Sequence, residues 1–137
     1  MTYIGIDTGT NTGVAVWDTS RHCFKQLDTM PIHRAMETVI MWRDVVGREN
    51  ISVIFEDARL RKWYDTNSNA KLQGAGSIKR DASIWEDFLT DKGIPFLSQA
   101  PSKGMTKWND QTFKAVTGWS MRTSNHARDA ALLVFGR

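Results

Sequence analysis

The sequence contains a single cysteine and no long hydrophobic run. Because Cys23 stands alone, neither a disulfide framework nor a cysteine zinc site can be built within one chain, which fits a reducing compartment. The longest late apolar run, residues 130–135, is far shorter than the roughly 20 residues that a transmembrane helix needs. Residues 1–7 lack the basic start and the apolar stretch of a secretory signal. We therefore expect a cytoplasmic protein that has no membrane partner.

Internal repeats and low-complexity linkers are missing as well. A chain of 137 residues can bury about two-thirds of its unfolded surface without disulfides or metals. We expect residues 1–137 to form a single domain around one core.

Positive charge is concentrated in two stretches. The formal net charge is +3, but residues 57–80 hold six lysines and arginines against two acids, and residues 101–128 hold five against one. Clustered cations favour a polyanionic partner, although solvent-exposed basic loops are also common. The six tryptophans could stack on nucleic-acid bases or could equally be core residues.

Two short apolar runs around a turn of glycine, asparagine and threonine predict a hairpin over residues 3–17. Its first strand ends in Asp7, which is expected at the open end of the hairpin. Gly9 and Gly13 permit the backbone angles that the turn needs. An acidic side chain that ends an apolar strand either hydrogen-bonds the turn or meets a cation.

The rest of the pattern predicts alternating strands and helices. Further strands are expected over 22–30, 51–55 and 94–97, the last near a sheet edge because of its proline. Helices are expected over 31–47, 70–92, 109–116 and 124–135, from apolar spacing and capping residues. This order indicates an α/β fold in which a five-stranded sheet has helices on both faces.

Three carboxylates are expected at the ends of elements. Asp7 ends the first strand and Glu56 follows another, while Asp129 shares a face of the last helix with His126. If the two strands are parallel neighbours, their acids meet where open α/β sheets place their sites. Clustered carboxylates become stable when they bind hard cations, and two Mg²⁺ ions roughly 4 Å apart can activate a water for phosphodiester cleavage. Taken singly, each residue could also be an ordinary surface group.

Three motifs in this order resemble the RuvC-like Holliday-junction resolvases of the ribonuclease H-like nuclease superfamily. The motifs are Gly5-Ile6-Asp7-Thr8-Gly9 with Thr12-Gly13, then Phe55-Glu56, then His126-Ala127-Arg128-Asp129-Ala130. The likeness spans nearly the whole chain. It implies a ribonuclease H-like fold with a mixed sheet, and a crossover junction endodeoxyribonuclease that uses two metal ions. The matching catalytic and metal-binding residues are Asp7, Glu56, Asp129 and His126, with Mg²⁺ as cofactor and Mn²⁺ as a substitute.

The resemblance also implies a branched-DNA partner and a homodimer, since a four-way junction needs two symmetric cuts. The expected DNA-binding residues lie in the two basic stretches: Arg61, Lys62, Trp63, Tyr64, Lys79, Arg80, Lys103 and Lys107. The two aromatic members are candidates for insertion at the centre of the junction. The expected dimer surface is the helix 70–92, through Gly74, Ala75, Gly76, Ile78, Ile84, Trp85 and Phe88.

The sequence departs from the family at two positions. Thr8 stands where a proline often follows the aspartate, and Ala58-Arg59-Leu60 stands where the family has an aromatic residue soon after the glutamate. The compact size and the divergent loops look like those of a phage or prophage member.

Other functions fit parts of the pattern. Actin-like ATPases and sugar kinases share the motif Gly-Ile-Asp-x-Gly-Thr, but they need two such domains and a further phosphate loop. A YqgF-like nuclease acting on ribosomal RNA has a similar length, although its glutamate motif continues Arg-Leu-Thr-Thr. A non-catalytic module that binds branched DNA would need only the basic loops, which leaves the three acids unexplained.

Overall fold

The structure, a computed structural model, describes residues 1–60, 69–101 and 108–137, with the helical residues 69–75 described by their backbone. Its strands are β1 (Thr2–Asp7), β2 (Asn11–Asp18), β3 (Cys23–Pro31), β4 (Ile51–Glu56) and β5 (Phe96–Gln99). Its α-helices are α1 (Ile32–Val46), α2 (Asn69–Asp91), α3 (Asp110–Thr117) and α4 (Asn125–Leu132). Single 3₁₀ turns, Arg48–Asn50 and Ala58–Leu60, flank β4.

The five strands form one mixed sheet in the order β3-β2-β1-β4-β5. β1 pairs antiparallel with β2 and parallel with β4, and β5 is a parallel edge strand. The edge position is as predicted, but the strand begins after Pro95 and does not contain it. The pairing of β1 with β2 confirms the predicted hairpin. One detail was wrong: Asp7 pairs with Gly13 next to the turn, so the carboxylate lies at the closed end of the hairpin.

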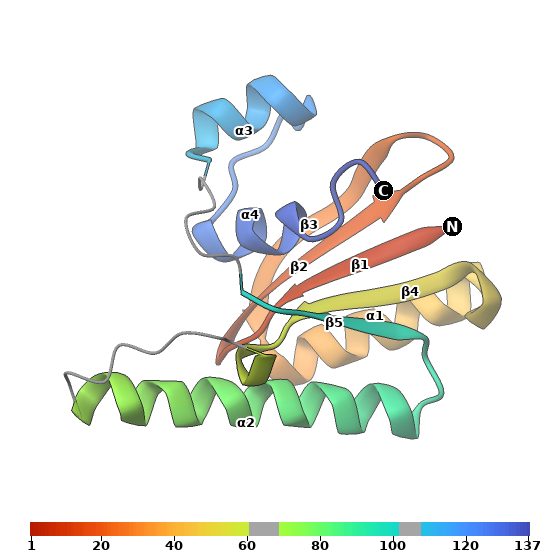
Figure 1. Ribbon diagram of the computed structural model, residues 1–137. Helices are drawn as coiled ribbons and strands as arrows, with labels where there is room; N and C mark the ends of the chain where they lie inside the picture. The colour runs from red at the N-terminus through yellow and green to blue at the C-terminus, as the bar shows by residue number, and fades with distance from the viewer. Residues whose placement is uncertain (61–68, 102–107) are drawn as a thin grey trace.

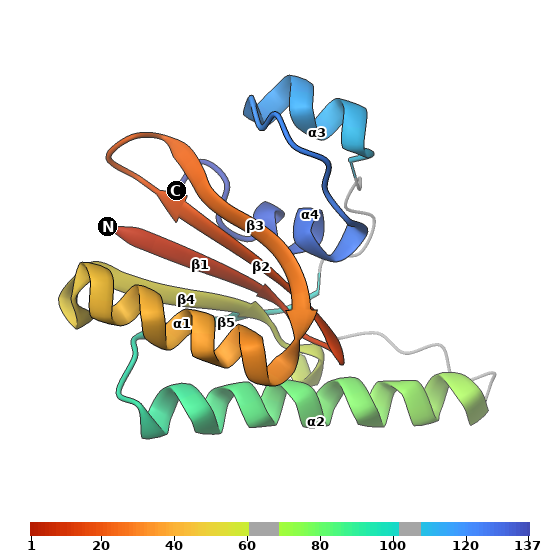
Figure 2. The same cartoon turned by 180° about the vertical axis from the view of Figure 1, so that it is seen from behind.

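Helices cover both faces of the sheet, as the sequence predicted. α1 and α2 lie on one face, and α4 lies on the other with α3 beyond it (Figures 1 and 2). The alternation along β1 directs Ile4 and Ile6 into the core under α1 and α2, while Tyr3 packs on the opposite side. On that opposite side Ile54, Phe24 and Phe113 form a second cluster with the apolar residues of α4. The sheet is thus filled from both faces.

The helix α2 uses its apolar residues mainly within its own chain. Trp85 is completely buried, so the expectation that it contributes to a dimer surface was wrong, while Phe88 is half-buried against the same core. Ile78 and Ile84 are each 41% exposed and remain accessible. A β-carbon on Gly76 would meet nothing within 4 Å, so no other element among the described residues packs closely on this glycine.

The first and last residues lie side by side. The indole Nε1 of Trp17 donates a hydrogen bond to the carbonyl of Arg137, and the backbone N–H of Thr19 donates to the carbonyl of Met1. Both termini lie at the end of the sheet opposite the one where β1 ends at Asp7 (Figure 1). Within the described ranges no helix is long and apolar enough to cross a membrane.

Candidate active site

Two of the predicted acids lie side by side at one end of the sheet. Ile6 of β1 is in register with Phe55 of β4, and the next residue on each parallel strand is an acid, Asp7 and Glu56. Both carboxylates are half-buried at the point where their strands leave the sheet. The parallel pairing that the sequence argument required is confirmed.

The helix α4 brings a third group to this edge. The imidazole Nδ1 of His126 lies 3.0 Å from the carboxylate Oδ2 of Asp7, within hydrogen-bonding distance. The His126 side chain is 51% exposed and that of Asp7 21% exposed, so one side of the pair faces solvent. Asp129 is half-buried three residues further along the same helix. The helix thus brings an imidazole to the Asp7 carboxylate and places Asp129 on the same helix.

Two glycines allow α4 to lie directly on the sheet. A β-carbon on Gly13 would come within 2.0 Å of the carbonyl oxygen of His126, and one on Gly5 within 2.1 Å of the carbonyl oxygen of Ala130. Only hydrogen can occupy these positions. The expectation that Gly13 serves the turn was wrong, since it is a strand residue with no positive φ and its role is close packing.

The start of α4 is held by its cap. The side chain of Ser124 accepts a hydrogen bond from the backbone N–H of Ala127, and its hydroxyl also contacts the hydroxyl of Thr29 on β3. The cap thus ties the helix to an edge strand of the sheet. His126 lies in the first turn that this cap organises.

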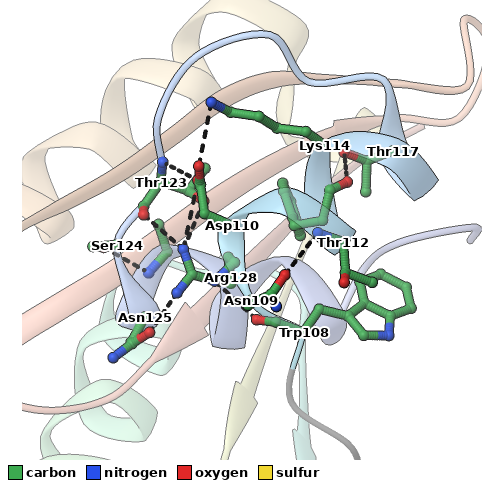
Figure 3. Close-up of polar contacts among 12 residues, drawn as sticks. Trp108, Asn109, Asp110, Thr112, Lys114, Thr117, Thr123, Ser124, Asn125 and Arg128 are labelled. Carbon is green, nitrogen blue, oxygen red and sulfur yellow. Dashed lines mark hydrogen bonds and ion pairs between the residues drawn. The ribbon is translucent and has the colours of Figure 1, made fainter.

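A polar cluster behind α4 holds the preceding segment in place (Figure 3). The carboxylate of Asp110 accepts hydrogen bonds from the backbone N–H of Thr123 at 2.8 Å and from its hydroxyl at 2.7 Å, while the ammonium group of Lys114 lies 3.2 Å away. The Thr123 hydroxyl and N–H, with Lys114 nearby, lower the pKa of Asp110 from 3.8 to about 2. At neutral pH the connection between α3 and α4 is therefore hydrogen-bonded, through Thr123, to an ionised carboxylate.

A second ionic cluster follows Glu56 directly. Asp57 is 2% exposed, and its carboxylate accepts hydrogen bonds from the Arg59 backbone N–H and from the guanidinium Nε, both at 2.9 Å. Arg59 also reaches the carboxylate of Glu86 on α2. The hydrogen bond from Arg59 lowers the pKa of Asp57, and the same partners raise the pKa of Arg59. This cluster fastens the end of β4 to α2.

The donor types at the site fit a hard divalent cation, because carboxylate oxygens are the ligands that Mg²⁺ prefers. Within residues 1–60, 69–101 and 108–137, however, no group of three or more His, Cys, Asp or Glu side chains is arranged to hold a metal ion. The structure brings Asp7 and His126 into contact and places Glu56 beside Asp7. A three-ligand group would require these side chains to turn toward a common point.

The basic stretches are only partly available for binding. Arg59, Lys114 and Arg128 are engaged with acids of the same chain, which sequence composition could not reveal. On α2, Arg80 is exposed and Lys79 is half-buried. The other expected DNA-binding residues lie outside the described residues: Arg61, Lys62, Trp63, Tyr64, Lys103 and Lys107.

The fold is the ribonuclease H-like α/β fold, with a mixed five-stranded sheet between helices. No protein-family model and no curated protein sequence matches the chain. Its structure is similar to that of T. thermophilus RuvC, solved in complex with a Holliday junction substrate. The TM-score is 0.62 and the sequence identity 14%, over 98% of this chain and 91% of that chain. At this identity the similarity shows a shared fold.

Proposed function

We propose that the protein is a metal-dependent endonuclease that cuts branched DNA and resolves four-way junctions by paired phosphodiester hydrolysis. The observation that carries the proposal is the contact of His126 with Asp7 beside Glu56, at the carboxyl ends of two parallel strands. The shared fold with a RuvC solved on a Holliday junction supports the choice of substrate. Membership of a phage or prophage lineage stays a prediction.

The proposed cofactor is Mg²⁺, two ions per site, with Mn²⁺ as a substitute. Asp7, Glu56 and Asp129 would supply the carboxylate ligands, and His126 would act as a further ligand or orient the attacking water. When bound, such ions activate a water and stabilise the leaving oxygen of a phosphodiester. The contact with Asp7 keeps His126 beside the proposed carboxylate ligands.

DNA binding is proposed along the basic stretches. Arg80 and Lys79 are the described residues of this surface, and phosphate contacts by such residues carry no sequence information. Neutralising one phosphate contact is expected to weaken binding to all sequences and to reduce the log–log salt slope by about one. Loss restricted to one DNA sequence, with an unchanged slope, would indicate base contacts instead.

A homodimer is proposed because one carboxylate cluster can make one cut, whereas a junction needs two symmetric cuts. Ile78 and Ile84 on α2 are each 41% exposed, and they are the described apolar residues of this helix that a second copy could cover. Light scattering of the free protein and of its junction complex tests the stoichiometry. One chain per junction that still cuts both strands in a single binding event would refute the dimer.

A substrate panel tests the proposed activity. A four-way junction, a Y-fork, linear duplex and structured RNA are each incubated with Mg²⁺ or with EDTA. We expect metal-dependent cleavage of the junction, abolished in Asp7→Asn, Glu56→Gln and Asp129→Asn, and retained in Asp28→Asn on the exposed side of β3. Preferential cleavage of structured RNA would favour the YqgF-like alternative. Tight junction binding without cleavage would favour the non-catalytic module.

A further inference from the structure

Arg128 is a charged residue on the last helix, α4, and its side chain is buried in the protein. The residue is 8% exposed, although it lies between the candidate site residues His126 and Asp129. A guanidinium removed from water is costly unless its N–H groups are paired. The acceptors of its N–H groups therefore show which segments Arg128 holds together.

The guanidinium binds both ends of the segment that contains α3. Its Nε donates to the carbonyl of Trp108 at 3.0 Å, before α3, and its Nη1 donates to the carbonyl of Thr123 at 2.6 Å, after α3. Nη1 also donates to the Thr123 hydroxyl at 2.9 Å, and Nη2 donates to the side chain of Asn125 (Figure 3). Asp110 lies 3.7 Å from Nη1 and completes the charge pairing.

These contacts need the shape of arginine. Three different nitrogens point to four acceptors in separate directions, a pattern that the planar guanidinium fork supplies. The lysine ammonium group has its three donors on a single nitrogen and cannot reach the same set. Arg128→Lys would keep the charge and most of the apolar stem but could not pair with all four acceptors at once.

The same contacts act on the candidate site, because α4 has eight residues and cannot hold its orientation alone. On its inner side the carbonyls of His126 and Ala130 rest on glycines of the sheet. On its outer side Arg128 holds the helix to the segment around α3. Contact on two sides restricts both rotation and sliding of the helix.

We propose that Arg128 is a positioning residue: its guanidinium sets the rotation of α4 and thereby holds His126 against Asp7 and keeps Asp129 at the same edge. The proposal deepens the proposed nuclease function and rests on it for its catalytic consequence. Its structural part, the dependence of the His126–Asp7 contact on Arg128, can be measured without any substrate.

The test compares Arg128→Lys with Arg137→Lys, a matched change in an arginine whose Nε donates only to the carbonyl of Leu133 among its described hydrogen bonds. Imidazole ¹H–¹⁵N spectra report the His126 contact, and His22 and His33 serve as internal references. Among the three histidines, we expect Arg128→Lys to shift only the His126 signals, and Arg137→Lys to shift the signals of none of them. Unchanged His126 signals in a folded Arg128→Lys protein would overturn the proposal, whatever its thermal midpoint.

Junction cleavage below the unfolding temperature provides the second readout. Arg128→Lys is expected to lower kcat at least tenfold with KM within twofold, because the DNA-binding residues are untouched. If the wild-type protein cuts no DNA, the proposed function fails, and the imidazole spectra still decide the positioning role. Should Arg128→Lys fail to fold, Asn125→Ala removes only the Nη2 partner and is expected to shift the same His126 signals by a smaller amount; no shift there would overturn the proposal.

Discussion

The two faces of the sheet are covered in different ways. α1 and α2, 15 and 23 residues long, cover one face through a broad apolar cluster. α4, with eight residues, lies on the other face through a second apolar cluster and two glycine contacts, and a buried arginine holds its outer side. Apolar packing is non-directional and tolerates small shifts, whereas backbone contact and hydrogen bonds specify one position. The candidate site residues His126 and Asp129 are on the helix that is positioned in the second way.

The largest loss of stability is expected on the apolar face. Leu89→Ala removes a completely buried side chain from α2 and should lower the free energy of unfolding by about 2–5 kcal/mol. Ile84→Ala, on the same helix but 41% exposed, should change it by less than about 0.5 kcal/mol. Urea denaturation measures both. The His126 imidazole signals should not move in either variant, and a shift would show that the two faces are coupled.

On the α4 face, Gly13→Ala is expected to act on position more than on stability. The added methyl group overlaps the carbonyl of His126 at 2.0 Å, so the helix must move, at a cost of about 1–3 kcal/mol. The His126 imidazole signals should shift, because the contact with Asp7 is lost. Gly76→Ala is the matched control, because its β-carbon meets nothing within 4 Å and α2 should gain about 0.5–1 kcal/mol. Equal effects of the two substitutions would contradict the close-contact role.

As the pH is lowered, the α3–α4 connection should loosen before the packing of α1 and α2 on the sheet is affected. The pKa of Asp110 is lowered from 3.8 to about 2, so its contribution to stability is complete above pH 4 and is lost as the pH falls toward 2. The Thr123 amide resonance should therefore change between pH 4 and pH 2. Asp110→Asn should be less stable than wild type at pH 5, and the difference should shrink toward pH 2. A constant difference across this range would contradict the assignment.

The smallest effect is expected where an ion pair is exposed. Glu86→Gln breaks the contact from α2 to Arg59, but the two side chains are 43% and 33% exposed and Asp57 keeps its own bonds. Thermal or urea unfolding should show a loss of about 0.2–1 kcal/mol. Asp57→Asn, at a carboxylate with a 2% exposed side chain, should cost more. A reversed order would mean that the link to α2 matters more than the buried carboxylate.

Much of the fold was predictable because it depends on local patterns. The hairpin, α1 and the strand before Glu56 follow from apolar period and from turn and helix-start residues. The parallel pairing of β1 with β4 was the condition on which the predicted site depended, and the structure meets it. The pairing of these two strands places Asp7 and Glu56 side by side, as the register confirms. Their role as metal ligands stays a prediction.

The supports of the site were not predictable from local patterns. Gly13 meets His126 across more than one hundred residues, and a glycine in a strand does not reveal its partner. Arg128 and Arg59 counted as free positive charge in the sequence, yet both are held by acids that only the fold brings near. Long-range burial of charged groups leaves no periodic signal. Composition therefore overstated the positive surface available to a polyanion.

The adjacent chain ends have a practical consequence. Because Met1 and Arg137 emerge beside one another, away from the edge that carries Asp7, a short flexible linker could join them without crossing that edge. The protein is thus suited to circular permutation, with new ends opened in an exposed turn away from α4. A fluorophore or a surface tether at either present end would leave the Asp7 edge facing solution, where a substrate of the proposed function could reach it.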